Sequence, residues 1–151
     1  MSKTLAVALL VMHLGTLAYL AVRLLQAAKT QVGHRICWPS SVQPTPEYIL
    51  YTLFLSNFVG ICFARTLHYQ FYCWYISSVP LLLLLSNSGG QRPSLSSAVV
   101  LVLVMALLEY SFHIFPATPT SSALLQLTHA YALAQSLWRE PPAVTDKPKV
   151  H

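Results

Sequence analysis

Residues 65–75 read Arg-Thr-Leu-His-Tyr-Gln-Phe-Tyr-Cys-Trp-Tyr and lie between two apolar runs, so that an arginine, a histidine and five aromatic rings interrupt an otherwise hydrophobic region. In a helix, Arg65, His68, Tyr72 and Tyr75 follow one another at i, i+3, i+7 and i+10 and share one face. A face with a cation, an imidazole and two phenol hydroxyls suits an anionic ligand. Aromatic residues at this density also mark a membrane–water boundary, and composition alone favours that second interpretation.

The composition around this stretch indicates a membrane protein. Of the 151 residues 55% are hydrophobic and only 9% are charged, against roughly 25% charged residues in soluble domains. Nine Lys and Arg residues exceed four Asp and Glu residues, but they lie singly between apolar runs, which argues against nucleic-acid binding. Three cysteines are too few for a disulfide framework.

Apolar runs of the length that a bilayer requires, about 17 to 25 residues, predict an all-α polytopic bundle of about five transmembrane helices. The first run exceeds the usual core of a cleavable signal peptide, which favours a retained helix over that alternative. The connection 26–47 reads as a proline-stiffened loop, and residues 139–151 read as a disordered tail. The predicted spans cover approximately residues 5–22, 48–64, 69–85, 95–115 and 123–138.

The cations predict the orientation of these spans. With 26–47, 86–94 and the tail in the cytosol, seven Lys and Arg residues lie on the cytosolic side, and only Lys3 and Arg65 lie opposite. The aromatic stretch then lies at the luminal surface. The final residues contain Lys147 and Lys149 in a pattern typical of a dilysine endoplasmic-reticulum retrieval signal, with a merely solvated tail as the alternative.

The order of residues in 56–75, Ser-Asn-Phe-Val-Gly-Ile-Cys-Phe-Ala-Arg-Thr-Leu-His-Tyr-Gln-Phe-Tyr-Cys-Trp-Tyr, followed by Pro80, resembles the dolichyl-phosphate-mannose-dependent α-1,3-mannosyltransferases of the endoplasmic reticulum. The resemblance runs from about Tyr48 to the C-terminus and is dense only up to Pro80. It implies a GT-C type glycosyltransferase that extends the lipid-linked five-mannose oligosaccharide at the luminal face, with dolichyl-phosphate-mannose as donor and no cofactor. Its partners are then the two dolichol-linked substrates and membrane lipid.

Carried over by residue, the resemblance implies a substrate-binding set in the aromatic stretch. Arg65 is expected to hold the dolichyl phosphate, because a guanidinium can bind two phosphate oxygens at once. The other expected contacts are with sugar hydroxyls, the mannose ring or the first isoprenes, and involve His68, Tyr69, Gln70, Tyr72, Trp74 and Tyr75. The aromatic members are equally explained as interface anchors. No metal site is expected, because His13, His113 and His129 lack partners at ligand spacing and read as packing or polar contacts.

The resemblance also implies a catalytic base. Relatives carry an Ile-Asp-Trp motif whose aspartate is the expected acid/base, and no such motif occurs here. The chain therefore looks like a C-terminal part of the enzyme and is expected to be inactive alone. Glu109, with His113 at i+4, is a candidate base, but a protonated Glu109 bonded to a neighbouring helix is the favoured interpretation. A non-catalytic membrane scaffold or assembly subunit is the alternative function.

Overall fold

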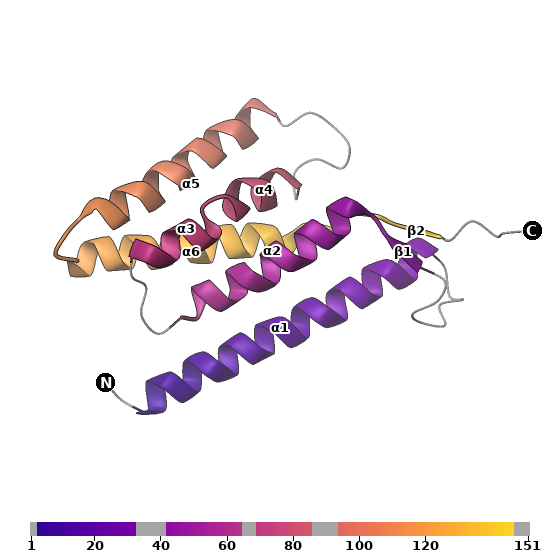
Figure 1. Ribbon diagram of the computed structural model, residues 1–151, viewed down its shortest axis with the longest axis horizontal. Coiled ribbons are helices and arrows are strands. Elements are labelled where there is room, and N and C mark those ends of the chain that lie inside the picture. Colours follow the sequence, from indigo (N-terminus) through magenta and orange to yellow (C-terminus); the bar gives the residue numbers. More distant parts are fainter. Residues whose placement is uncertain (1–2, 33–41, 65–68, 86–93, 147–151) are drawn as a thin grey trace, which may run out of the picture.

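Six helices dominate the computed structural model, which describes residues 3–32, 42–64, 69–85 and 94–146 (Figure 1). Two three-residue strands pair as a small antiparallel ribbon, in which Val42 lies opposite Asp146 and Pro44 opposite Val144. The all-α prediction is confirmed. The helices are α1 (Lys3–Val32), α2 (Pro46–Cys62), α3 (Tyr69–Tyr75), α4 (Ser78–Leu85), α5 (Leu95–His113) and α6 (Pro119–Trp138), and the strands are β1 (Val42–Pro44) and β2 (Val144–Asp146).

Local sequence signals set three of the helix starts. The hydroxyl of Thr45 accepts a hydrogen bond from the backbone N–H of Tyr48 at the start of α2. Ser94 does the same for Ser97 at the start of α5, and Thr118 forms a reciprocal capping box with Ser121 at the start of α6. Each cap satisfies N–H groups that the first turn of a helix leaves without a partner. In α2 and α6 a proline follows the cap, where its missing N–H costs nothing.

The run 69–85, expected as one helix, is broken into α3 and α4 by a turn at Ile76 and Ser77. Pro80 accounts for the break, because proline cannot donate to the carbonyl of the residue four places earlier and its ring clashes with that carbonyl. Ser78 bridges the interruption by donating its hydroxyl proton to the carbonyl of Tyr75 at 2.8 Å. The two pieces have about 10 and 12 Å of helical rise at 1.5 Å per residue, so neither alone crosses a bilayer core of about 30 Å.

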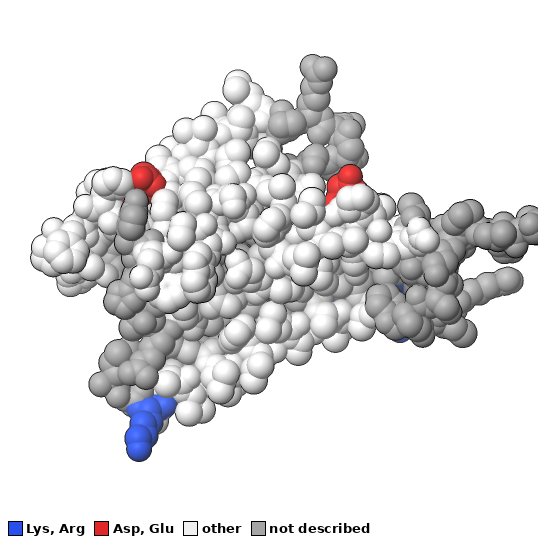
Figure 2. Space-filling view, viewed as in Figure 1, with Lys and Arg blue, Asp and Glu red and all other residues white. Residues whose placement is uncertain are grey.

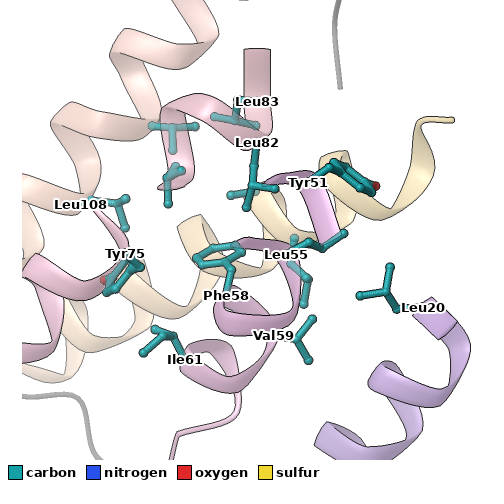
Figure 3. Close-up of a cluster of buried hydrophobic side chains, with 14 of the residues drawn as sticks. Leu20, Tyr51, Leu55, Phe58, Val59, Ile61, Tyr75, Leu82, Leu83 and Leu108 are labelled. Carbon is teal, nitrogen blue, oxygen red and sulfur yellow. The ribbon is translucent and has the colours of Figure 1, made fainter. Parts of the chain in front are cut away.

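The core lies where α2 meets α4, α5 and α6 (Figure 3). Leu55, Phe58 and Val59 of α2 are almost completely buried, as are Leu82 of α4 and Leu108 of α5. Tyr75, at the end of α3, points into the same cluster. The C-terminal end of the aromatic stretch is thus packed into the interior of the bundle.

The chain passes back and forth so that its predicted luminal segments meet at one end of the bundle. The start of α1, the end of α2, the start of α3, the end of α5 and the start of α6 lie together at the left in Figure 1. The two strands, the start of α2 and the end of α6 lie at the opposite end. This arrangement has the alternation that the orientation prediction requires, although the orientation itself stays a prediction.

The end with the strands differs from the sequence prediction in two ways. First, α1 continues to Val32, ten residues beyond the predicted span, because Leu24, Ala27 and Ala28 are good helix formers although the apolar run has ended. Second, the predicted disordered tail contains β2, and Val144 donates its backbone N–H to the side chain of Gln31 at 2.7 Å. A bond from Thr45 to the carbonyl of Ala143 at 2.7 Å holds the same segment. Lys147 and Lys149 lie outside the described residues.

Two helices are long and apolar enough to cross a membrane, in the part of the chain that the structure describes: 3–31 and 95–113. In the first of these helices, only 6% of the most apolar 18-residue stretch is buried within the molecule. Large apolar side chains cover its outer surface. Figure 2 shows a visible face that is almost free of charged side chains between its two ends. These two helices coincide with the first and fourth predicted spans, and the five-span topology stays a prediction.

Candidate functional site

A tyrosine–carboxylate pair joins α3 to α5. The hydroxyl of Tyr72 donates to Oε2 of Glu109 at 2.5 Å, and the Tyr72 ring packs on Phe112 with 5.0 Å between centroids. Glu109 lies in the last turn of α5, and 47% of its side-chain surface is exposed. A hydrogen bond to a carboxylate is stronger than one between neutral groups. The pair therefore fixes the position of both side chains while leaving the carboxylate accessible.

The same pair lies at the edge of an open groove of about 520 Å³ between α5 and the α3–α4 segment. Apart from Tyr72 and Glu109, the residues that line it are apolar: Pro80, Leu101, Val102, Met105 and Ala106. One hydrogen-bonding pair beside an apolar wall is the lining expected for an amphiphile with a polar headgroup and a hydrocarbon tail.

His113 lies on the other side of the carboxylate. Its Nδ1 is 3.5 Å from Oε1 of Glu109 and 3.0 Å from the carbonyl oxygen of the same residue. The predicted i+4 pairing of Glu109 with His113 is thus confirmed. Glu109 also contacts a neighbouring helix through Tyr72, which is the contact that its favoured structural interpretation expects, and the protonation in that interpretation stays a prediction. Whether the carboxylate takes a proton in a reaction stays a separate hypothesis.

A second polar pair lies inside the bundle, where α3 meets α6. The hydroxyl of Tyr75 is 2.8 Å from Nε2 of His129, and at most 1% of either residue is exposed. Phe58 of α2 packs against both rings, with centroids 5.9 Å from Tyr75 and 5.7 Å from His129. Tyr72 and Tyr75 also touch each other edge to face at 5.9 Å. Four side chains from α3, α5 and α6 thus form a continuous series from Glu109 to His129.

The predicted binding residues do not all face the same way. Gln70 and Trp74 are exposed, and 63% of Trp74 is accessible, which fits a contact with lipid or substrate. Tyr72 is half-buried at the groove. Tyr75 is completely buried, so the direct substrate contact expected of it is wrong for this structure. Tyr69 begins α3, and Arg65 and His68 lie outside the described residues.

Sequence reasoning did not identify the partner of His129, although the polar contact expected of it is confirmed. It read this histidine as a packing or polar contact, and no spacing rule connects it with Tyr75, which is 54 positions away. A signal was present in α6 itself, because His129 falls on the same helical face as Ala132, Leu133 and Ser136, all of which are buried. A histidine on a buried face needs a polar partner. The identity of that partner depends on how α3 packs.

Comparison with known proteins supplies the biological context of this site. A family model described as "ALG3 protein" matches residues 1–122. Proteins of Homo sapiens and Mus musculus, each named Dol-P-Man:Man(5)GlcNAc(2)-PP-Dol alpha-1,3-mannosyltransferase, are 44% identical over 97 residues, which cover 64% of this chain and 21% of each relative. A Dictyostelium discoideum protein named as a probable enzyme of the same kind is 29% identical over 140 residues, covering 89% of this chain and 29% of the relative.

The chain spans about a fifth of the length of its human and mouse relatives. No solved structure matches it. The relatives' lipid-linked substrates together with the two long apolar helices make this a membrane-associated protein. Among the residues that the structure describes, no group of three His, Cys, Asp or Glu side chains is placed to hold a metal ion.

Proposed function

Because this chain belongs to the ALG3 protein family, we propose that it forms the donor-lipid side of a dolichyl-phosphate-mannose-dependent α-1,3-mannosyltransferase. The reaction would transfer mannose to the lipid-linked five-mannose oligosaccharide at the luminal face of the endoplasmic reticulum. The observation that carries the proposal is the Tyr72–Glu109 pair at the edge of an apolar groove. A groove of this kind accepts an isoprenoid chain along its wall and a sugar phosphate at its polar edge.

In this proposal Arg65 binds the donor phosphate, because it precedes α3 by only four residues and its guanidinium has the planar fork that matches phosphate oxygens. His68, Tyr69 and Gln70 contact sugar hydroxyls, and the exposed ring of Trp74 lies against the mannose or the first isoprenes. Glu109 orients Tyr72 rather than acting as the base. The base is expected from the aspartate loop that the family resemblance implies, and that motif is absent here.

The test is a chimera in which this chain replaces the segment of the human relative to which it aligns. It is expressed in cells that lack the α-1,3-mannosyltransferase, and the extracted lipid-linked oligosaccharides are separated by chromatography. We expect a six-mannose species from the chimera and none from the chain alone. A chimera that inserts into the membrane but leaves only the five-mannose species would favour the scaffold alternative.

The proposal also includes a multi-pass topology in the endoplasmic reticulum with a cytosolic tail that carries Lys147 and Lys149. Glycosylation sequons placed on flexible tethers within 116–122 should be modified, because that segment is expected in the lumen. Sequons placed within 86–94 should stay unmodified. Both mobilities are read on gels before and after deglycosylation. Modification of the 86–94 tether alone would reverse the orientation and remove the aromatic stretch from the luminal side.

A further inference from the structure

The buried pair of Tyr75 and His129 carries a free-energy cost for the folded bundle. Nδ1 of His129 is buried and has no hydrogen-bond partner among the described residues. An unsatisfied buried polar atom destabilises a fold, and a leucine or phenylalanine of similar volume would avoid that cost. Packing alone therefore does not explain an imidazole here. The bond from Nε2 to Tyr75 is what the imidazole provides.

The element that this bond holds is weak by itself. Helix α3 has seven residues, and an isolated helix of that length is unstable in water. It also ends at a break, so α4 does not continue its hydrogen-bond ladder. Side chains must therefore fix how far α3 is rotated about its axis.

Two side-chain hydrogen bonds from adjacent turns contribute to this task, beside a longer bond from Asn57 of α2 to the carbonyl of Trp74 at 3.4 Å. Tyr72 bonds to Glu109 of α5, and Tyr75 bonds to His129 of α6. Because the two tyrosines are three positions apart, their rings lie close on the helix surface, yet they reach partners on different helices. A single bond would leave α3 free to rotate about one attachment, and two bonds to different helices remove that freedom. In the resulting orientation Gln70 and Trp74 are exposed.

We propose that His129 is a positioning residue: through Tyr75 it sets the rotation of α3, and so directs Tyr72 toward Glu109 and the groove and Trp74 toward the surface. The proposal rests on the proposed function for the identity of the site, but the orientation of α3 can be measured without any activity. His129 contacts no substrate in this scheme. Its effect passes through the hydroxyl of Tyr75.

The variants separate the hydrogen bond from packing. Tyr75→Phe keeps the ring and removes the hydroxyl, and His129→Leu keeps the volume and removes Nε2. His129→Gln places an amide near the position of Nε2 and can restore the bond. Val104→Ala is the matched control, because Val104 is a buried core residue of α5 that contributes no hydrogen bond through its side chain.

The first measurement is amide hydrogen exchange of the chain in lipid nanodiscs, followed by mass spectrometry. Tyr75→Phe and His129→Leu should each speed exchange in 70–76 and leave α2 and the first half of α5 unchanged, whereas His129→Gln should restore slow exchange. An unchanged exchange rate in 70–76 for Tyr75→Phe would overturn the proposal. Equal acceleration in all helices, as expected for Val104→Ala, would reduce His129 to a packing residue and also overturn it.

The second measurement is the mannose-transfer rate of the chimera. Two residues that act through one bond are non-additive, so each single variant should lose roughly tenfold and the double variant should lose no more. Additive losses would overturn the shared role. If the chimera without any point substitution transferred no mannose, that result would contradict the proposed function instead. Hydrogen exchange would then still decide whether His129 orients α3.

Discussion

The two ends of the bundle use buried tyrosines in different ways. At the aromatic end, defined here by Phe58, Tyr72, Tyr75, Glu109 and His129, both tyrosines bond to side chains of other helices. A neighbouring bond from Asn57 of α2 goes to the backbone carbonyl of Trp74. At the ribbon end, defined by Arg23, Gln31, Thr45, Tyr51 and residues 136–146, most of the bonds between segments have a backbone partner, and Tyr51 also interacts with the side chain of Arg23. Arg23 donates to the carbonyl of Arg139, and Tyr51 donates to the carbonyl of Ser136 at 2.6 Å.

The difference indicates what each end is built for. A backbone carbonyl is present whatever residue carries it, so a bond to it requires only one specific side chain and serves to hold a segment in place. A bond between two side chains requires both, and here the partners of the two tyrosines, a carboxylate and an imidazole, are groups that take part in proton transfer and ligand binding. We infer that the ribbon end holds the C-terminal segment in place and that the aromatic end forms the candidate functional site.

The largest effect should come from the arginine that precedes the aromatic end. Arg65→Ala in the chimera should lower the transfer rate by about 100- to 1000-fold, as the loss of one preorganised donor to developing charge does in other enzymes. Arg65→Lys should give an intermediate rate, because an ammonium keeps the charge but loses the paired geometry.

The measurement is the initial rate from dolichyl-phosphate-mannose, normalised to correctly inserted protein. Lys29→Ala is the matched control, since Lys29 is an exposed cation toward the ribbon end, and its rate should not change. A full rate for Arg65→Lys would remove the bidentate phosphate role. A full rate for Arg65→Ala would remove Arg65 from the site.

Local parts of the fold were predictable and distant parts were not. The starts of α2 and α6 follow from Thr45-Pro46 and Thr118-Pro119, because caps act within one turn. The break in 69–85 was signalled by Pro80, which the span prediction did not take into account. The pairing of β2 with β1 joins residues about a hundred positions apart, and composition cannot reveal such a partner.

The candidate site divides along the same line. Tyr72 and Glu109 were both named from the sequence, one as a binding residue and one as a candidate base, but their bond was not foreseen because it depends on the packing of α3 on α5. Tyr75 was assigned to the substrate face by helical spacing. Spacing identifies residues that share a face and does not tell whether that face is turned inward. Arg65 and His68 stay predictions.

The next effect concerns Glu109 and distinguishes positioning from base catalysis. Glu109→Gln keeps an oxygen that accepts from Tyr72, so the transfer rate should stay within about threefold of the original. Glu109→Leu removes that acceptor and should lower the rate by roughly 10- to 150-fold, which corresponds to a hydrogen bond with a charged group.

Glu47→Gln, in the first turn of α2 at the other end of the bundle, is the matched control and should have no effect on the transfer rate. If Glu109 takes the proton of the acceptor hydroxyl, Glu109→Gln should instead lose about 100- to 10,000-fold. That result would make Glu109 the base and contradict the positioning role given to it here.

The smallest expected effect comes from removing one tyrosine hydroxyl at each end of the bundle, which tests the comparison between the two ends. Tyr51 and Tyr75 are both completely buried tyrosines whose hydroxyls bond to another helix, so Tyr→Phe is the same chemical change at the two ends. Tyr51→Phe should lower the free energy of unfolding by about 1 kcal/mol, the usual net value of one such bond, and should leave the transfer rate per folded molecule unchanged. Stability is measured by SDS titration in mixed micelles, and hydrogen exchange should rise at the C-terminal end of α6, where Ser136 lies. Tyr75→Phe should destabilise by a similar amount yet reduce transfer, because its bond orients α3.

If the two variants lowered transfer equally, the ribbon end would be as much a part of the site as the aromatic end, and the distinction between side-chain and backbone partners would have no functional meaning in this protein.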